Sequence, residues 1–238
     1  MRSLAREIKA VFFDFGGTLA EEAVNRDVWI WARLRDKGVQ RELEAVRAAR
    51  QVARLLHQKH QPRYGAGVKD QERYWTWWYQ QLLGEVGVGG DREALAEWLW
   101  LTQTVPHRLY EDTAPALEEM RGRGWRLGVI SNWDNLDLEA VLQDLGIWEF
   151  FAMALPSAQA GYAKPRPEIF EQALEMIGAQ AHEAAHVGDS YRADVMGARG
   201  VGILGVLVAR GGPPTGGEAP WVPALTEVPA LLDGVTGD

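Results

Sequence analysis

The chain has 238 residues, of which 47% are hydrophobic and 24% are charged, a composition typical of a soluble globular protein with an ample core. Its net charge of −8 argues against nucleic acid as the main partner, because phosphate backbones are bound by clustered Lys and Arg. The absence of cysteine excludes disulfides and thiolate chemistry, and no run of about 20 apolar residues offers a membrane span.

The first predicted strand, Lys9–Asp14, ends on a carboxylate that is followed by a glycine turn. The segment Val11-Phe12-Phe13-Asp14-Phe15-Gly16-Gly17 is apolar around a single acid, which is typical of a buried strand. Open α/β sheets bind their ligands at the carboxyl ends of strands, so Asp14 could be a nucleophile, a metal ligand or both. The alternative is a turn aspartate that accepts hydrogen bonds from nearby backbone N–H groups.

A helical insertion follows the first strand. Between about Val24 and Val105 the sequence favours four helices, which we expect at Arg26–Arg35, Arg41–Gln58, Asp70–Leu83 and Asp91–Thr102. This length predicts an all-helical cap domain at residues 21–105, inserted into an α/β core domain that comprises residues 1–20 and 106–238.

Seven of the 11 tryptophans lie in this insertion, where packing of a helical bundle explains most of them. One or two could instead face a cleft and hold an aromatic or sugar-like substrate. Trp75, Trp77 and Trp78 cannot all share one helical face, so at least one is expected to point away from the bundle core.

The rest of the chain alternates between strands and helices. Further strands are predicted at Arg126–Ser131, Phe150–Leu155, Ala184–Asp189 and Ile203–Val208, and helices at Ala114–Arg123, Leu136–Leu145, Pro167–Ile177 and Ser190–Arg199. Such alternation implies parallel strands joined by right-handed crossovers, and hence a three-layer α/β fold. Helix C-caps are expected at four glycines: Gly124, Gly146, Gly178 and Gly200. A loop at Gly211–Gly217, an edge strand at Trp221–Leu225 and a short helix at Val228–Leu232 complete the prediction.

Polar groups follow the predicted strands wherever these strands end. Ser131-Asn132 ends the second core strand, Lys164-Pro165 precedes a helix, and Gly188-Asp189 is followed by Asp194 five positions later. An aspartate, a serine, a lysine and an acid pair at one sheet edge are together what phosphoryl transfer through an aspartyl-phosphate needs.

With Asp14-x-x-Gly17-Thr18, Ser131, Lys164 and Gly188-Asp189-x-x-x-x-Asp194 in this order, the chain resembles the haloacid dehalogenase (HAD) superfamily, specifically its members with a helical C1 cap. The resemblance covers nearly the whole chain. It implies a three-layer Rossmann-like parallel-sheet core with an inserted all-helical cap.

The resemblance also implies roles for the motif residues. Asp14 is the expected nucleophile, and Mg²⁺ is expected to be held by Asp14, the main-chain carbonyl of Gly16 and Asp189. Lys164 is expected to hold Asp14 and the phosphate in line, and Asp194 to orient Lys164 or a metal-bound water. The substrate phosphate is assigned to the remaining motif residues, namely Ser131 and the binding positions Gly17, Thr18 and Asn132.

Gly16 departs from the pattern of HAD phosphatases, which carry a second aspartate two residues after the nucleophile. That acid protonates the leaving oxygen, and the loss of a general acid typically costs ~10²–10⁴-fold. The substrate could have a good leaving group, or Glu21 or Glu22 could supply the proton. The chain could also be a haloacid dehalogenase, a phosphonatase using Lys37, Lys59 or Lys69, or a binding protein with a weakened site.

The retained Gly188-Asp189 pair favours phosphoryl transfer, because a metal-free dehalogenase has no use for it. We therefore expect a Mg²⁺-dependent phosphatase of a small phosphorylated metabolite, with no nucleic-acid or membrane partner. We expect it to act in the cytoplasm, because charged residues near the N-terminus interrupt the apolar run that a signal peptide needs. We expect a monomer or a homodimer.

Overall fold

The computed structural model describes residues 7–60, 67–214 and 218–236. The chain divides into two compact units. The core unit comprises the residues up to Glu21 and those from Arg108 onward, and Glu22–His107 form the second unit, which we call the cap unit after the predicted cap domain. The sequence had placed the divisions after residues 20 and 105. None of the described helices is both long and apolar enough to cross a membrane.

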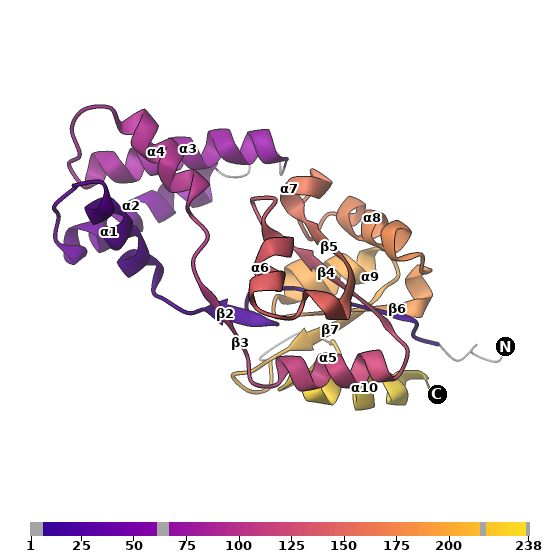
Figure 1. Cartoon of the computed structure of the whole chain (residues 1–238). Coiled ribbons are helices and arrows are strands. Elements are labelled where there is room, and N and C mark those ends of the chain that lie inside the picture. The colour runs from indigo at the N-terminus through magenta and orange to yellow at the C-terminus, as the bar shows by residue number, and fades with distance from the viewer. Residues whose placement is uncertain (1–6, 61–66, 215–217, 237–238) are drawn as a thin grey trace. The chain divides into compact units, whose positions relative to one another are not determined.

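The core unit is built on a parallel sheet, which has six strands in the described part of the chain, in the order β5-β4-β1-β6-β7-β8 (Figure 1). Every neighbouring pair in it runs parallel. The strands are β1 (Ala10–Phe13), β4 (Arg126–Ser131), β5 (Phe151–Pro156), β6 (Ala184–Gly188), β7 (Leu204–Val208) and β8 (Trp221–Val222). The Rossmann-like α/β fold is thus confirmed, and all strands present their carboxyl ends at one sheet edge.

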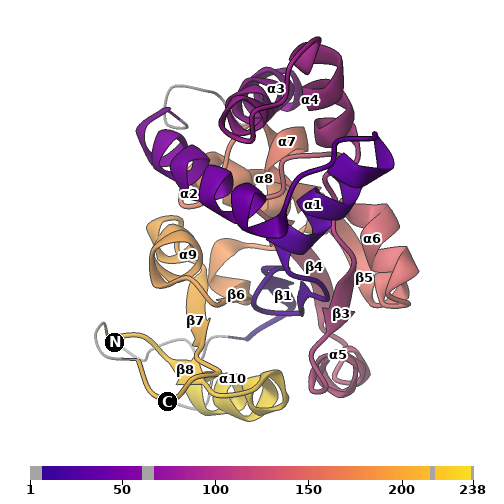
Figure 2. The ribbon, with the colours of Figure 1, turned by 90° about the vertical axis from the view of Figure 1, so that its left-hand side faces the viewer.

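Helices cover both faces of this sheet. Side chains of β1 alternate, so that Val11 and Phe13 pack with α5, α6 and α10, whereas Ala10 and Phe12 pack with α8 and α9. Figure 2 shows α5 and α10 across the sheet from α8 and α9. The bounds are α5 (Thr113–Gly122), α6 (Leu138–Asp144), α7 (Ser157–Ala160), α8 (Pro167–Ile177), α9 (Gly197–Gly200) and α10 (Val228–Thr236), with short 3-10 turns η2 (Trp148–Phe150), η3 (Ala181–Glu183) and η5 (Leu225–Glu227).

Three of the four predicted cap glycines end helices in the left-handed conformation. Gly124, Gly146 and Gly178 have φ values of 81°, 70° and 69°. Gly200 does not, because α9 continues through it and the left-handed residue is Gly202, with φ of 86°. The glycine that ends this helix therefore lies two positions later than predicted.

The predicted helix Ser190–Arg199 is not a single α-helix. It begins as a π-helical turn, η4 (Tyr191–Met196), and becomes the α-helix α9 only from Gly197. Ser190 explains the wider first turn, because its carbonyl accepts hydrogen bonds from the N–H groups of both Asp194 and Val195. Such turns are frequent at functional sites, and this one carries Asp194.

Two short strands join the units along the chain and were not predicted. They are β2 (Ala20–Glu22) and β3 (His107–Leu109), which form a two-stranded sheet. With three residues each, they fall below the length at which a hydrophobic pattern identifies a strand.

The cap unit is helical, as its composition predicts. Its helices are α1 (Arg26–Asp36), α2 (Leu43–His60), α3 (Val68–Glu85) and α4 (Arg92–Leu101). Their apolar faces enclose a separate core that includes Trp78 and Trp100, both largely buried. Trp75 and Trp77 are partly exposed yet still pack against this core, so all three tryptophans of α3 contribute to the bundle. A tryptophan side chain is large enough to reach the core from the edge of a helical face.

Candidate active site

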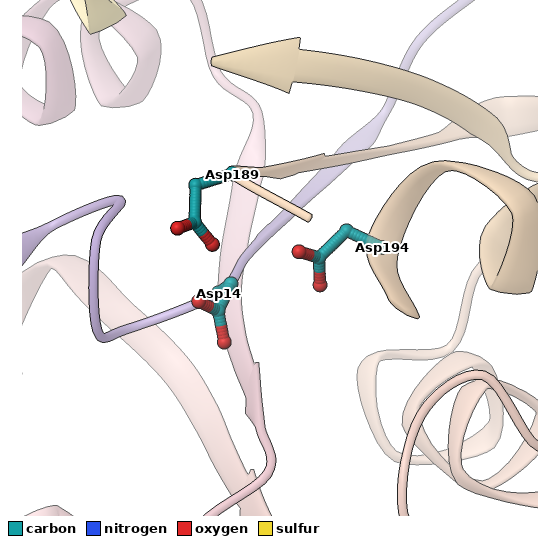
Figure 3. A group of neighbouring side chains, drawn as sticks. All are labelled: Asp14, Asp189 and Asp194. Carbon is teal, nitrogen blue, oxygen red and sulfur yellow. The ribbon is translucent and has the colours of Figure 1, made fainter. Parts of the chain in front are cut away.

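Three carboxylates meet at the carboxyl edge of the core-unit sheet (Figure 3). Asp14 directly follows β1, and Asp189 directly follows the neighbouring strand β6. Asp194 comes from the turn η4. One ligand atom from each of the three lies within 4.8 Å of the others. The strand order therefore brings together acids that are up to 180 positions apart in the sequence.

Lys164 is buried beside these acids, and all three of its ammonium donors are engaged. Its Nζ donates to Asp14 Oδ1, to Asp194 Oδ1 and to the carbonyl of Ile130, each at 2.7 Å. A lysine ammonium has three N–H donors. Lys164 can therefore supply positive charge to a substrate and fix the Asp14 carboxylate, but its protons are already used within the protein.

Asp194 is tied to its neighbours by both carboxylate oxygens. Oδ1 accepts from Lys164 Nζ and lies 3.0 Å from His186 Nε2, and Oδ2 accepts from the backbone N–H of Ser190 at 2.9 Å. Gly188 makes this approach possible, because a Cβ there would lie 2.2 Å from Asp194 Cγ. These contacts favour the predicted role of Asp194 in orienting Lys164.

The loop after Asp14 turns tightly back on itself. The N–H groups of Leu19 and Ala20 both donate to the carbonyl of Phe15, at 2.9 and 3.1 Å. Gly17 has a φ of 84°, and a Cβ there would stand 2.4 Å from Asp189 Oδ2. Glycine is required at this position for both its backbone angle and its contact with Asp189.

The structure has room for a side chain at Gly16, where the HAD phosphatase pattern has an aspartate. It is exposed, its φ lies outside the left-handed region, and a Cβ there would meet no atom within 4 Å. The missing acid is therefore not excluded by the backbone or by its surroundings.

Thr18 is held inside the loop. Its side chain is fully buried, its Oγ1 has no hydrogen-bond partner, and its carbonyl accepts from Arg210 Nη2 at 2.8 Å. Arg210 also donates to both oxygens of Asp112 at 3.0 Å, and its guanidinium lies 3.8 Å from the centre of the Tyr110 ring. These contacts favour a structural role of Thr18 in shaping the nucleophile loop.

Ser131 and Asn132 lie at the end of β4. Ser131 is its last residue and is largely buried. The side chain of Asn132 clasps the backbone of Lys164, since its Oδ1 accepts from Lys164 N at 2.7 Å and its Nδ2 donates to Lys164 O at 3.0 Å. Asn132 thus helps to place Lys164, a contact that the sequence did not predict.

Burial dominates the electrostatics of the cluster. It raises the pKa of Asp14, against the opposing effect of Lys164 and with a further increase from Asp194. Burial also raises the pKa of Asp189. Burial disfavours ionised Asp194 too, but Lys164 and His186 outweigh it and hold the pKa of Asp194 well below its usual range. Burial lowers the pKa of Lys164, but Asp14 and Asp194 more than reverse this effect.

This charge balance fits a divalent cation. Three carboxylates face one lysine ammonium, which leaves a negative excess in a site that disfavours ionised Asp14 and Asp189. Oxygen donors of this kind are the ligands that Mg²⁺ prefers. Because Asp194 already accepts three hydrogen bonds, Asp14 and Asp189 are the carboxylates best placed to hold the ion.

Glu21 and Glu22, the predicted substitutes for the missing acid, are both engaged by arginines. Glu21 accepts from Arg108 at 2.8 Å, and Glu22 forms an ion pair with Arg26. Either acid would have to leave its arginine before it could donate a proton to a substrate.

The burial of His186 predicts a stability that depends on pH. The ring is fully buried, and burial lowers its pKa. Below about pH 6.5 the His186 ring binds a proton in the unfolded chain but not in the folded chain. The free energy of unfolding should therefore decrease as the pH is lowered, by up to about 1.4 kcal/mol per pH unit. Denaturant titrations of metal-free protein between pH 7 and 5 should show a smaller fall for His186→Gln than for the wild type. The exposed His182, changed to Gln, serves as control, and identical slopes in all three proteins would contradict the prediction.

His186 and Arg210 were missed by the sequence interpretation. His186 did leave a signal, since it is the single polar side chain in the buried strand Ala184–Gly188. Arg210 lies two residues after β7, at the same sheet edge as the other site residues, but an arginine in a Gly/Pro-rich loop carries no distinguishing pattern.

Comparisons with known proteins agree with this architecture. A family model described as "haloacid dehalogenase-like hydrolase" matches residues 8–202. The chain is 33% identical over 201 residues to haloacid dehalogenase-like hydrolase domain-containing protein 3 of Bos taurus, an alignment that covers 82% of this chain and 76% of the relative. It is 27% identical to a glyceraldehyde 3-phosphate phosphatase of Methanopyrus kandleri, covering 86% and 85%. Its fold matches a 2-haloacid dehalogenase of Pseudomonas syringae with a TM-score of 0.70 at 24% identity, covering 95% and 99%.

Proposed function

Because the chain belongs to the haloacid dehalogenase-like hydrolases, we propose that it is a Mg²⁺-dependent phosphatase that acts on a small phosphorylated metabolite through Asp14. The observation that carries the proposal is the Asp189 carboxylate, which lies beside Asp14 and against the backbone of Gly17. A second carboxylate at that point provides a cation site, which the attack of one anion on another needs.

Asp14 would act as the nucleophile. One carboxylate oxygen forms a bond to phosphorus, while the bond from phosphorus to the substrate oxygen breaks and its electron pair leaves with that oxygen. Water then attacks phosphorus, the bond from phosphorus to the Asp14 oxygen breaks, and its electron pair regenerates the carboxylate. Phosphate is released, and the proton that water loses balances the proton that the departed anion takes up from solvent. Lys164 fixes the Asp14 carboxylate through its 2.7 Å hydrogen bond and offsets negative charge on the phosphoryl group.

Mg²⁺, held by Asp14, Asp189 and the Gly16 carbonyl, would neutralise charge on the phosphoryl oxygens. Ser131, at the end of β4, would donate its hydroxyl proton to a phosphoryl oxygen, together with backbone N–H groups of the nucleophile loop.

The preferred substrates follow from Gly16. No acid stands at this position to protonate the leaving oxygen, so phosphates whose leaving groups are stable as anions, such as aryl and acyl phosphates, should react best.

Haloacid dehalogenation is the second candidate. Halide leaves without a proton, which suits Gly16, and a 2-haloacid dehalogenase shares the fold. Asp189 argues against dehalogenation, because a dehalogenase that works without a metal has no use for the Gly188-Asp189 pair. A phosphonatase is less well supported, because Lys37 and Lys69 of the cap unit are exposed, whereas a Schiff-base lysine needs burial to lower its pKa. The side chain of Lys59 lies outside the described residues.

The deciding experiment is a hydrolysis screen with aryl, acyl, sugar and nucleotide phosphates and 2-chloropropionate, each with Mg²⁺ and with EDTA. Release of phosphate that requires Mg²⁺ supports the proposal. Chloride release in EDTA would overturn it in favour of a dehalogenase, and no turnover of any compound would leave a binding protein.

The metal site itself can be tested without activity. Asp189→Asn should weaken Mg²⁺ binding at least about tenfold, because an amide oxygen replaces one of two anionic ligands. Isothermal titration calorimetry measures this change directly. Asp144→Asn, on the exposed end of α6, is the control, and an unchanged Mg²⁺ affinity in Asp189→Asn would remove this residue from the site.

A further inference from the structure

His186 is a buried polar residue that the proposed reaction does not use. It lies on β6 with no exposed surface, and its ring stands edge-on to Phe170 with centroids 5.3 Å apart. The rest of the strand, Ala184–Gly188, is apolar, so packing alone would be served by an aliphatic side chain. Burying an imidazole is costly unless its polar atoms are used.

The hydrogen bonds of the ring define its tautomer. Nε2 lies 3.0 Å from Asp194 Oδ1, which is an acceptor when ionised, so Nε2 carries the proton. Nδ1 is buried and has no hydrogen-bond partner. A neutral ring with its single N–H on Nε2 is the form that satisfies this environment, because a proton on Nδ1 would be buried without an acceptor.

We propose that His186 is a positioning residue, which fixes the Asp194 carboxylate so that Lys164 is aimed at Asp14. The contacts run from His186 Nε2 to Asp194 Oδ1, at 3.0 Å, and from Lys164 Nζ to the same oxygen and to Asp14 Oδ1, each at 2.7 Å. His186 thus acts on the nucleophile through two intermediate side chains.

Asp194 needs this support because its own element is irregular. It stands on the π-helical turn η4, and besides His186 the donors to its carboxylate are Lys164 Nζ and the backbone N–H of Ser190. Without the histidine, Oδ1 would accept from Lys164 alone, and the carboxylate could turn about its Cβ–Cγ bond. Lys164 would then follow Asp194 and lose its alignment with Asp14. Small misalignments of a reacting group can cost up to ~10²-fold in rate.

The test uses two substitutions of similar size. His186→Gln keeps a donor near the position of Nε2, whereas His186→Met removes it. With 4-nitrophenyl phosphate and saturating Mg²⁺, we expect kcat to fall about 10–100-fold in His186→Met, with KM and Mg²⁺ affinity nearly unchanged, and to be restored within about threefold in His186→Gln.

Phe170→Leu is the control for packing, because it removes the ring that contacts His186 but leaves the hydrogen bond intact. It should lower thermal stability without changing kcat. A kcat in His186→Met equal to that of the wild type would overturn the inference, and so would equal losses in the Met, Gln and Phe170→Leu variants, which would indicate packing alone.

The inference rests on the proposed reaction at Asp14, but two readouts do not depend on it. Long-range ¹H–¹⁵N NMR should show a neutral ring protonated at Nε2, identified as the signal that His186→Gln lacks. A crystal structure of His186→Met should show the Lys164–Asp14 hydrogen bond lost. A wild type that hydrolyses no phosphate ester would overturn the proposed function alone. A ring protonated at Nδ1, or an unmoved Lys164, would overturn the positioning role alone.

Discussion

Replacing Asp14 by asparagine should lower kcat by at least about 10⁴-fold, because the amide is nearly isosteric with the carboxylate but is a poor nucleophile. The fold should persist. Burial raises the pKa of Asp14, so its ionised form is disfavoured at this position, and its removal leaves Lys164 paired with Asp194. We therefore expect the free energy of unfolding to stay the same or to increase.

Two measurements on the same preparation check this expectation: phosphate release from 4-nitrophenyl phosphate with Mg²⁺, and denaturant unfolding. Asp144→Asn is again the matched control, since it makes the same chemical change on an exposed helix end. Turnover retained in Asp14→Asn would remove Asp14 from the nucleophile role. A loss of turnover accompanied by unfolding would show instead that Asp14 is needed for the fold.

Restoring the missing acid at position 16 should raise the activity toward alkyl phosphates. Gly16→Asp is expected to raise kcat/KM for an alkyl ester such as glycerol phosphate by about 10²-fold, the lower range of a general acid, and to change 4-nitrophenyl phosphate hydrolysis little. Both structural conditions are met, because residue 16 has a φ open to any side chain and no atom within 4 Å of a new Cβ. Its neighbour Gly17, with a φ of 84° and Asp189 Oδ2 at 2.4 Å from a new Cβ, would not tolerate the change.

Gly16→Asn distinguishes the effect of a new acid from the effect of added volume, because asparagine has nearly the same size as aspartate but no acidic proton to donate. An increase in both variants would argue against acid catalysis. If the wild type already hydrolyses alkyl and aryl phosphates equally fast, another residue supplies the proton, and Glu21→Gln becomes the next variant to make, even though Arg108 engages Glu21.

The fold was predictable because its signals are long and repeated. Buried parallel strands contain continuous apolar runs, such as Leu127–Ile130 in β4, and alternation with helices leaves few topologies. The same topology brought Asp14, Asp189 and Lys164 together at one sheet edge, as expected.

What the sequence did not predict depends on side-chain contacts across long separations. The π-helical start of the segment after Ser190 has no local pattern that distinguishes it from an α-helix, because its first turn is widened by backbone bonds to the Ser190 carbonyl. The clasp between Asn132 and the backbone of Lys164, and the bond from Arg210 to Thr18, join residues 32 and 192 positions apart. Such pairs are visible only once the strands are placed side by side.

The bond from Arg210 to the nucleophile loop also bears on where this domain can be cut. The match to the family model ends at residue 202, yet β7 pairs with β6, which presents Asp189, and Arg210 lies just beyond β7. Asp112, which holds Arg210, also accepts the backbone N–H of Leu225 at 2.6 Å. A fragment trimmed to the limits of the family match would thus lose the strand beside Asp189 and the side chain that anchors Thr18, so the segment that the family model matches is shorter than the unit that can assemble the site.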